Sequence, residues 1–239
     1  MPVLVTGGSG MLGRALRLRF PDALFPSRAE LDVTLPETIE RYLEGRDVAA
    51  VVHAAALTDA ALCESDHALA LKVNVEGTAA ILSAVRKRSP DCYFLVVSTA
   101  GVFPCDRGGY HEHSTKGPVN FYCRTKLQAE EIVLRETNCC VVRTNFIRRG
   151  KWPHPRAFVD RFGTFLYDTG VAKGIKDLVE RRFDGPVHLC GDRKMSLFEA
   201  ARRTDPDVGH MSLSDYQGPP LPVDMSLITR RWKTYSLKD

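Results

Sequence analysis

The stretch Thr6-Gly7-Gly8-Ser9-Gly10-Met11-Leu12-Gly13 decides the fold. It follows the apolar run Val3–Thr6, which is typical of a buried strand, and it leads into Met11–Phe20, which has helical spacing. Glycines spaced in this way permit a tight turn, a close approach of the backbone to a pyrophosphate, and close packing of helix on strand. The free N–H groups at a helix N-terminus favour phosphate. The stretch therefore predicts a dinucleotide site formed by Thr6, Gly7, Gly10, Met11, Leu12 and Gly13.

The rest of the first half alternates between apolar runs and helical patterns. Strands are predicted at Ala23–Phe25, Val48–His53, Cys92–Val97 and Cys140–Arg143, and helices at Pro36–Leu43, Ala68–Arg88 and Tyr122–Glu136. Such alternation indicates an α/β fold with a doubly wound parallel sheet, the Rossmann arrangement. The pattern loosens after Asn145. We therefore expect an NAD(P)-binding Rossmann domain over residues 1–145 and a small, contracted substrate lobe over 146–239, interleaved with the end of the sheet by a strand at Val187–Cys190.

Composition narrows the class of protein. The chain has 239 residues, 33 basic and 29 acidic side chains and a formal net charge of +4, a balance that does not point to nucleic acid or a membrane. No apolar run approaches the roughly 20 residues that span a bilayer, and the first residues enter a strand at once. We expect a cytoplasmic protein. Seven scattered cysteines without a CxxC pair indicate buried free thiols, with neither a disulfide framework nor a metal site.

The turn after the second predicted strand bears on the choice of coenzyme. Folds that prefer NAD usually place an acid there, whereas this chain has Ser27 and Arg28. A hydroxyl and a guanidinium suit a 2′-phosphate, so NADP (as NADPH) is favoured and NAD is possible. The alternative is that Arg28 is a solvated surface residue. Asp32 and Val33 follow and are placed to meet the adenine.

A proton-transfer pair is predicted at the start of the Tyr122–Glu136 helix. Tyr122 and Lys126 have the YxxxK spacing, which puts both on one helical face. A nearby ammonium favours the ionised phenol, so the lysine is expected to help the tyrosine exchange a proton near neutral pH. Ser98 and Thr99 end the preceding strand at the edge where open α/β sheets bind ligands. A hydroxyl there can meet a substrate carbonyl.

These segments resemble the extended short-chain dehydrogenase/reductase family, and within it the dTDP-4-dehydrorhamnose reductase branch. The resemblance runs through most of the chain, in LVTGGSGMLGRAL (4–16), AELDVT (29–34), VVHAAALTDAALCE (51–64), VNVEGT (73–78), VSTAGVF (97–103), GPVNFYCRTKLQAEE (117–131), VVRTNF (141–146), GPVHLCGDRKMSLFEAA (185–201) and LPVDMSL (221–227). It implies that Thr99, Tyr122 and Lys126 are the catalytic set. It also implies that Ala54, Ala55 and Ala56 line the cofactor and that Asn74 supports it. The alternative for Asn74 is a helix residue satisfied by backbone.

Several positions depart from the branch pattern. Ala100 and Gly101 stand where the branch usually has an acid and an aromatic residue, which argues against dehydration, and Ala61 and Cys123 stand where it has Asp and Gly. The region between Phe146 and Val159 is short for the substrate lobe. The basic loop Arg148-Arg149-Gly150-Lys151, with Arg143 nearby, either meets a nucleoside diphosphate or is a solvated charged loop.

Three functions are therefore open. The resemblance implies NADPH-dependent reduction of a nucleotide-linked 4-keto-6-deoxy sugar. Family members often dimerise, so the resemblance also leaves a homodimer open. A non-catalytic NADP-binding regulatory subunit is the second, favoured by the contracted lobe and opposed by the intact catalytic set. The third is an NAD-dependent sugar-nucleotide 4-epimerase, which uses the same residues but retains its cofactor.

Overall fold

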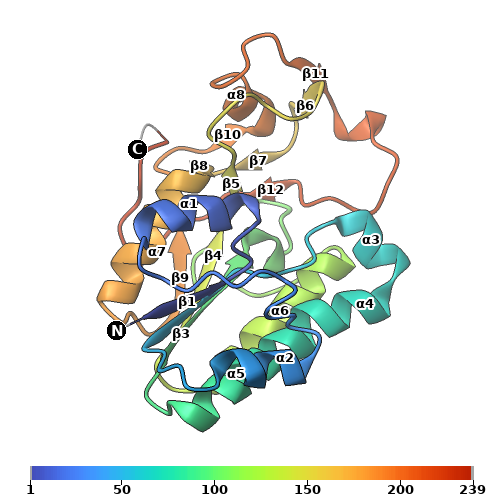
Figure 1. The fold of residues 1–239 in the computed structure, drawn as a ribbon. Helices are drawn as coiled ribbons and strands as arrows, with labels where there is room; N and C mark the ends of the chain where they lie inside the picture. The colour runs from blue at the N-terminus through green and yellow to red at the C-terminus, as the bar shows by residue number, and fades with distance from the viewer. Residues whose placement is uncertain (1, 238–239) are drawn as a thin grey trace.

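A five-stranded parallel sheet forms the centre of the computed structural model, which describes residues 2–237 (Figure 1). Its strand order is β1-β2-β3-β4-β9, and in the register Val52 lies between Val5 and Leu95. The strands are β1 (Val3–Thr6), β2 (Ala50–His53), β3 (Tyr93–Thr99), β4 (Cys139–Thr144) and β9 (Gly185–Leu189). They are almost wholly buried, as continuous apolar runs in a covered parallel sheet should be. The predicted doubly wound α/β fold is confirmed.

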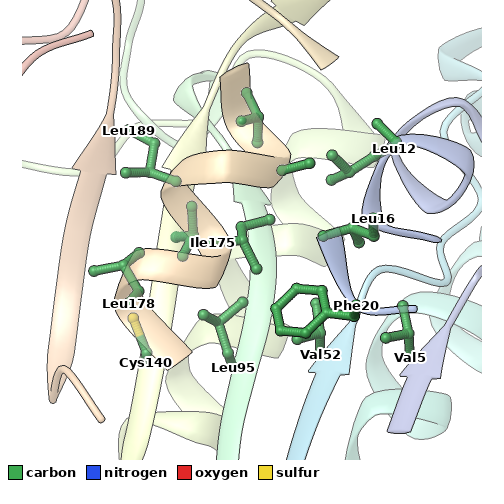
Figure 2. Close-up of a cluster of buried hydrophobic side chains, with 14 of the residues drawn as sticks. Val5, Leu12, Leu16, Phe20, Val52, Leu95, Cys140, Ile175, Leu178 and Leu189 are labelled. Carbon is green, nitrogen blue, oxygen red and sulfur yellow. The ribbon is translucent and has the colours of Figure 1, made fainter. Parts of the chain in front are cut away.

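Helices cover both faces of this sheet. One face carries α1 (Met11–Arg19) and α7 (Asp168–Glu180), which pack against each other over the strands. Figure 2 shows Leu16 of α1 and Ile175 of α7 lying over strand side chains such as Leu95. The other face carries α2 (Pro36–Leu43), α3 (Ala60–Ser65), α4 (His67–Leu71), α5 (Gly77–Arg88) and α6 (Phe121–Val133). Two separate apolar cores result, one on each face.

The sheet changes direction beside β1. From α1 the chain runs outward to Leu24, which makes a single parallel bridge to Leu4, and then returns to β2 on the other side of β1. The predicted strand Ala23–Phe25 was therefore wrong in extent. Pro26 follows at once and has no N–H to donate to a ladder. A ligand cleft is expected at the carboxyl end of β1, because that is where the winding reverses.

The predicted helix Ala68–Arg88 is interrupted by a π-helical turn, η1 (Lys72–Glu76), between α4 and α5. Within the run, residues 67–88, an 18-residue window has a mean hydropathy of 1.4, so by length and composition the run could cross a membrane. The prediction that no segment approaches that length was wrong. In this fold Ile81, Leu82 and Val85 of the run are buried against the sheet.

The small lobe lies at one end of the sheet and comes from the second half of the chain (Figure 1). It contains short strands and one short helix: β5 (Phe146–Ile147), β6 (Arg156–Phe158), β7 (Phe162–Gly163), β8 (Leu166–Tyr167), β10 (Met195–Ser196), α8 (Leu197–Ala201), β11 (Gly209–Met211) and β12 (Asp224–Met225). Between these elements the chain returns to the sheet through α7 and β9. The lobe and the sheet therefore share one stretch of sequence.

Candidate active site

The turn between β1 and α1 has the shape of a phosphate cradle. Gly7 has a φ of +75°, and a Cβ there would lie 2.7 Å from the Ala54 carbonyl carbon. A Cβ on Gly13 would lie 2.2 Å from the Gly7 oxygen, so only glycine lets α1 approach so closely. The helix begins after Gly10 with no side-chain cap and no acid in its first turn. Its first N–H groups are therefore available to an anion.

A first cavity of about 390 Å³ extends from this turn toward Arg28. Its walls include three of the predicted residues beyond the turn, Arg28, Asp32 and Val33, together with Ala54, Ala55 and Ala56. Arg28 Nε donates to Asp32 Oδ2 at 2.9 Å, and its side chain is otherwise exposed. Burial acts to raise the pKa of Asp32, but the hydrogen bonds from Arg28 and Thr34 outweigh it and lower that pKa to about 2. The Asp32 carboxylate therefore holds the Arg28 side chain in place through its Nε atom.

Ser27 is not among the residues that line this cavity. Its hydroxyl and its backbone N–H both donate to Glu30 Oε2, each at 2.8 Å. The local carboxylate competes for the hydroxyl that sequence reasoning assigned to a 2′-phosphate. Of the two predicted residues in this turn, the structure places only Arg28 at the cavity.

A second cavity of about 660 Å³ adjoins the first and shares Gly7, Gly10, Ala54 and Ala56 with it. Met11, Leu12 and Gly13 also line it. The structure brings Thr99, Tyr122 and Lys126 together on its wall. The Asn120 side chain caps α6 by accepting from the Cys123 N–H at 2.9 Å, which places Tyr122 in the first turn. Lys126 follows one turn later on the same face.

The protonation states at this wall differ from those predicted. Burial raises the pKa of Tyr122, with smaller contributions from Cys123 and Cys63, so the phenol keeps its proton at neutral pH. Burial also lowers the pKa of Lys126 to about 8, and Glu130 partly offsets that effect. The expectation that Lys126 acidifies the phenol was wrong for the chain alone, because burial raises the pKa of Tyr122 and Lys126 is not among the groups that act on it. Thr99 Oγ1 accepts from the Gly101 N–H at 3.0 Å, which leaves the Thr99 proton free to be donated.

Asn74 lies beneath the cavities rather than in their walls. It is 1% exposed, and its amide accepts from the Leu57 N–H at 2.8 Å and donates to the Leu57 carbonyl and the Thr125 hydroxyl, both at 3.0 Å. The alternative interpretation, a polar residue satisfied mainly by backbone, is the one the structure supports. Asn74 holds the end of the loop that carries Ala54, Ala55 and Ala56.

The predicted location of Arg143 was wrong. It was expected near the basic loop, but it is 2% exposed and pairs with Glu130 at 2.6 Å beneath the site. Of the loop itself, Arg148 lines the second cavity, while Arg149 lies over the Tyr167 ring with 5.9 Å from its Cζ to the ring centroid. A buried arginine needs a carboxylate partner, and no sequence pattern pairs two residues that lie 13 positions apart on different elements.

Sequence reasoning missed several residues of the second cavity, because most of them come from loops without a periodic pattern and the others stand at strand ends. They are Thr58, Thr144, Asn145, Trp152, His154, Arg161, Phe165 and Met225. Burial lowers the pKa of Arg161, whose Nε donates to the Pro222 carbonyl at 3.0 Å. Within residues 2–237, Thr144 Oγ1 and Asn145 Oδ1 are buried without a hydrogen-bond partner. Unpaired polar atoms at a cavity wall, with the glycine cradle, fit a polar ligand such as a dinucleotide.

Two further observations bear on the predictions. All seven cysteines are buried free thiols, as predicted, and in the described part of the chain no group of three or more His, Cys, Asp or Glu is placed to hold a metal ion. The space beside Gly101 is filled by Cys123, because a Cβ on Gly101 would lie 2.3 Å from Cys123 Sγ. The two departures from the branch pattern at these positions are thus packed against each other, with the sulfur occupying the space beside the glycine.

The sequence matches the model of one protein family, described as "RmlD substrate binding domain", over residues 1–212. The chain belongs to this family. A relative within it, the dTDP-4-dehydrorhamnose reductase of Mycobacterium tuberculosis, is 29% identical over 233 residues, which span 87% of this chain and 75% of that protein. The Burkholderia thailandensis protein of the same name is 36% identical over 159 residues, 63% of this chain and 52% of its own length.

Solved structures of RmlD-type reductases share the fold. A dTDP-4-dehydrorhamnose reductase from Clostridium acetobutylicum superposes with a TM-score of 0.86 at 22% identity, over 95% of this chain and 90% of that one. The Bacillus anthracis enzyme, solved with NADP, gives 0.85 at 21% identity, over 95% and 91%. A different kind of relative, the methionine adenosyltransferase 2 subunit beta of Rattus norvegicus, is 24% identical over 236 residues, 83% of this chain and 70% of that protein.

Proposed function

We propose that this member of the RmlD family uses NADPH to reduce a nucleotide-linked 4-keto-6-deoxy sugar. One observation carries the proposal. Thr99, Tyr122 and Lys126 line a single cavity that is continuous with the glycine cradle at Gly7 and Gly10. Relatives named dTDP-4-dehydrorhamnose reductase and dTDP-4-keto-6-deoxy-D-glucose reductase support the substrate class.

The side chains at the wall suit ketone reduction. When bound, NADPH supplies a hydride to the keto carbon, and the carbonyl oxygen must then gain a proton to become a hydroxyl. Tyr122 holds such a proton because its pKa is raised. Thr99 donates its free hydroxyl proton in a hydrogen bond that orients the carbonyl. The Lys126 ammonium binds a ribose hydroxyl and favours the phenolate that remains after proton transfer.

Residues at the far end of the cleft support NADPH over NADH. The Arg28 guanidinium lies at the first cavity and keeps Nη atoms free beyond its Nε contact with Asp32. A guanidinium binds a 2′-phosphate through charge-assisted hydrogen bonds, which NAD has no group to accept. Ser27 does not line this cavity beside Arg28, so Arg28 alone carries the preference and NAD stays a possible coenzyme.

The substrate end of the second cavity supports a nucleotide-linked sugar. Arg148 and Arg161 line the wall beyond Tyr122, where two positive side chains suit a diphosphate. Ala100 and Gly101 are buried and carry no acid that could eliminate water. The site therefore suits reduction rather than dehydration, with Tyr122 giving the proton that accompanies the hydride from bound NADPH.

Turnover with a panel of substrates tests the proposal. Purified protein should quench or shift NADPH fluorescence on binding, and NADPH absorbance should fall with a dTDP-linked 4-keto-6-deoxy sugar. Binding without turnover across dTDP-, UDP- and GDP-linked keto sugars would contradict it and favour the non-catalytic regulatory subunit; the rat relative is named as a subunit of another enzyme. NAD that survives purification, with interconversion of 4-epimers, would instead indicate the epimerase.

Three wider features belong to the same proposal. We infer that residues 1–145 bind the coenzyme while 146–239, of which 238 and 239 lie outside the described part, form the substrate lobe. The cavity supports this division, because its coenzyme end is built from the first half and Arg148, Arg161 and Met225 come from the second. A cytoplasmic location and a homodimer follow from the resemblance to sugar-nucleotide reductases and stay predictions.

A further inference from the structure

The face of α6 below the catalytic wall carries a second buried charge. Glu130 lies four residues after Lys126, so the two side chains occupy one helical face. Their exposed fractions are 1% and 3%. A carboxylate this deeply buried requires a structural or functional reason, because desolvation of a charge is costly unless it is paired.

Two neighbouring strands hold the Glu130 carboxylate in place. From β3, Ser98 Oγ donates to Oε1 at 2.6 Å. From β4, Arg143 Nε donates to both oxygens at 3.0 Å and Nη2 donates to Oε2 at 2.6 Å. Arg143 is itself fixed, since Nη1 donates to the Glu112 carbonyl at 3.0 Å. The carboxylate therefore cannot rotate away from the Lys126 side of the helix without breaking these bonds.

The Lys126 ammonium has no such clamp. Within residues 2–237 no hydrogen bond or ion pair joins it to the protein, and its side chain ends at the second cavity. The titratable groups around it are Tyr122 and Glu130 on its own helix and His53 on β2. Arg143 on β4 pairs with Glu130, and the Lys116 charge interacts with both members of that pair. Burial, with the Lys126 charge adding to it, lowers the pKa of His53 to about 3, so that ring is neutral. Of all these groups only Glu130 is negative.

We propose that Glu130 is a positioning residue, a carboxylate clamped by Ser98 and Arg143 that keeps the Lys126 side chain charged where it enters the cavity. The inference rests on the proposed function, because a charged Lys126 is useful only if ketone reduction needs its ammonium on the coenzyme ribose. The test of the inference, however, requires no turnover. The charge of the Glu130 carboxylate acts on Lys126 whether or not a keto sugar is reduced.

The direct test is an NMR titration of the full chain labelled with carbon-13 lysine, with Lys126→Arg identifying the resonance. Glu130→Gln removes the carboxylate, and Glu131→Gln is the matched control because it makes the same charge change at the next, exposed position of α6. The Lys126 midpoint should stay near pH 8 in the wild type and in Glu131→Gln. It should fall by about one unit in Glu130→Gln, as expected for loss of an adjacent opposite charge.

The pH dependence of NADPH affinity gives a second, independent test. At about pH 8 the affinity of Glu130→Gln for NADPH should be roughly fivefold weaker than that of the wild type, and at about pH 6 the two should match, because Lys126 is then charged in both. A purely structural role would weaken binding equally at the two pH values. That uniform loss, or an unmoved Lys126 midpoint, overturns the proposal.

Glu130→Gln leaves Arg143 without its carboxylate, and the variant can fail to fold for that reason. Glu130→Gln combined with Arg143→Met removes both charges and should show the lowered Lys126 midpoint in a folded chain. An unchanged midpoint there also refutes the inference. If the wild type does not bind NADPH while the midpoint still moves, the proposed function fails and the role of Glu130 in charging Lys126 stands.

Discussion

Gly13→Ala tests the cradle on which coenzyme binding depends. The added Cβ would lie 2.2 Å from the Gly7 oxygen and 2.6 Å from the Gly8 Cα. Both are backbone atoms, so no side-chain rotation relieves the overlap. Ordinary contact begins at 3.4 Å, and α1 and the turn must separate by about 1.2 Å, the difference between 3.4 and 2.2 Å.

A shift of that size should be visible in two measurements. Overpacking of this kind costs about 1–3 kcal/mol in the free energy of unfolding. Displacing the free N–H groups of α1 by about 1 Å should weaken NADPH binding about 10- to 100-fold, because a hydrogen bond to a charged phosphate contributes about 1.5–3 kcal/mol. Fluorescence titration with NADPH measures the affinity, and urea denaturation measures the stability.

Gly170→Ala in α7 is the control for Gly13→Ala. An added Cβ there lies 3.9 Å from the Leu166 Cβ, and neither cavity is lined by Gly170. It should leave NADPH affinity unchanged and stabilise the helix by about 0.5–1 kcal/mol. If Gly13→Ala binds NADPH within about twofold of the wild type, judged against this control, the close approach of α1 is not what forms the site.

Three further outcomes are expected. Turnover should be constant below about pH 8 and fall above it, because the required Lys126 ammonium is lost as pH rises through its pKa; a rate that keeps rising to pH 10 would contradict this role. Arg28→Ala should reduce the preference for NADPH over NADH about tenfold in competition binding, and an unchanged ratio would make Arg28 a surface residue. Gly101→Ala should lower the free energy of unfolding by about 1–3 kcal/mol, with Cys123→Gly restoring most of it; independent, additive effects in urea would refute their packing.

Features that depend on local chemistry could be predicted from the sequence. The Gly7 turn was predictable because a positive φ and a close backbone approach require glycine, and the strand and helix on either side show their own periodicity. Tyr122 and Lys126 were predictable as a pair because helical spacing alone places them on one face. Helices α1 and α2 and strands β1, β2, β3 and β4 follow from the same apolar patterns.

Features that depend on distant partners could not be predicted. From the sequence, Arg143 was expected near a basic loop, and only the fold shows that it forms an ion pair with Glu130 on α6. The pKa of Tyr122 required its burial to be known, since a nearby lysine predicts the opposite direction. Arg161 reaches the second cavity from a loop with no pattern to mark it, and Ser27 is captured by Glu30 three residues away.

The most direct test of the central claim compares Tyr122→Phe with the wild type in two assays. The variant loses only the hydroxyl, so NADPH affinity should stay within about twofold, while the rate of NADPH consumption with a dTDP-linked 4-keto-6-deoxy sugar should fall by about 100-fold or more. Full activity in the variant would mean that another group donates the proton, and would contradict the placement of the reacting carbonyl beside Tyr122.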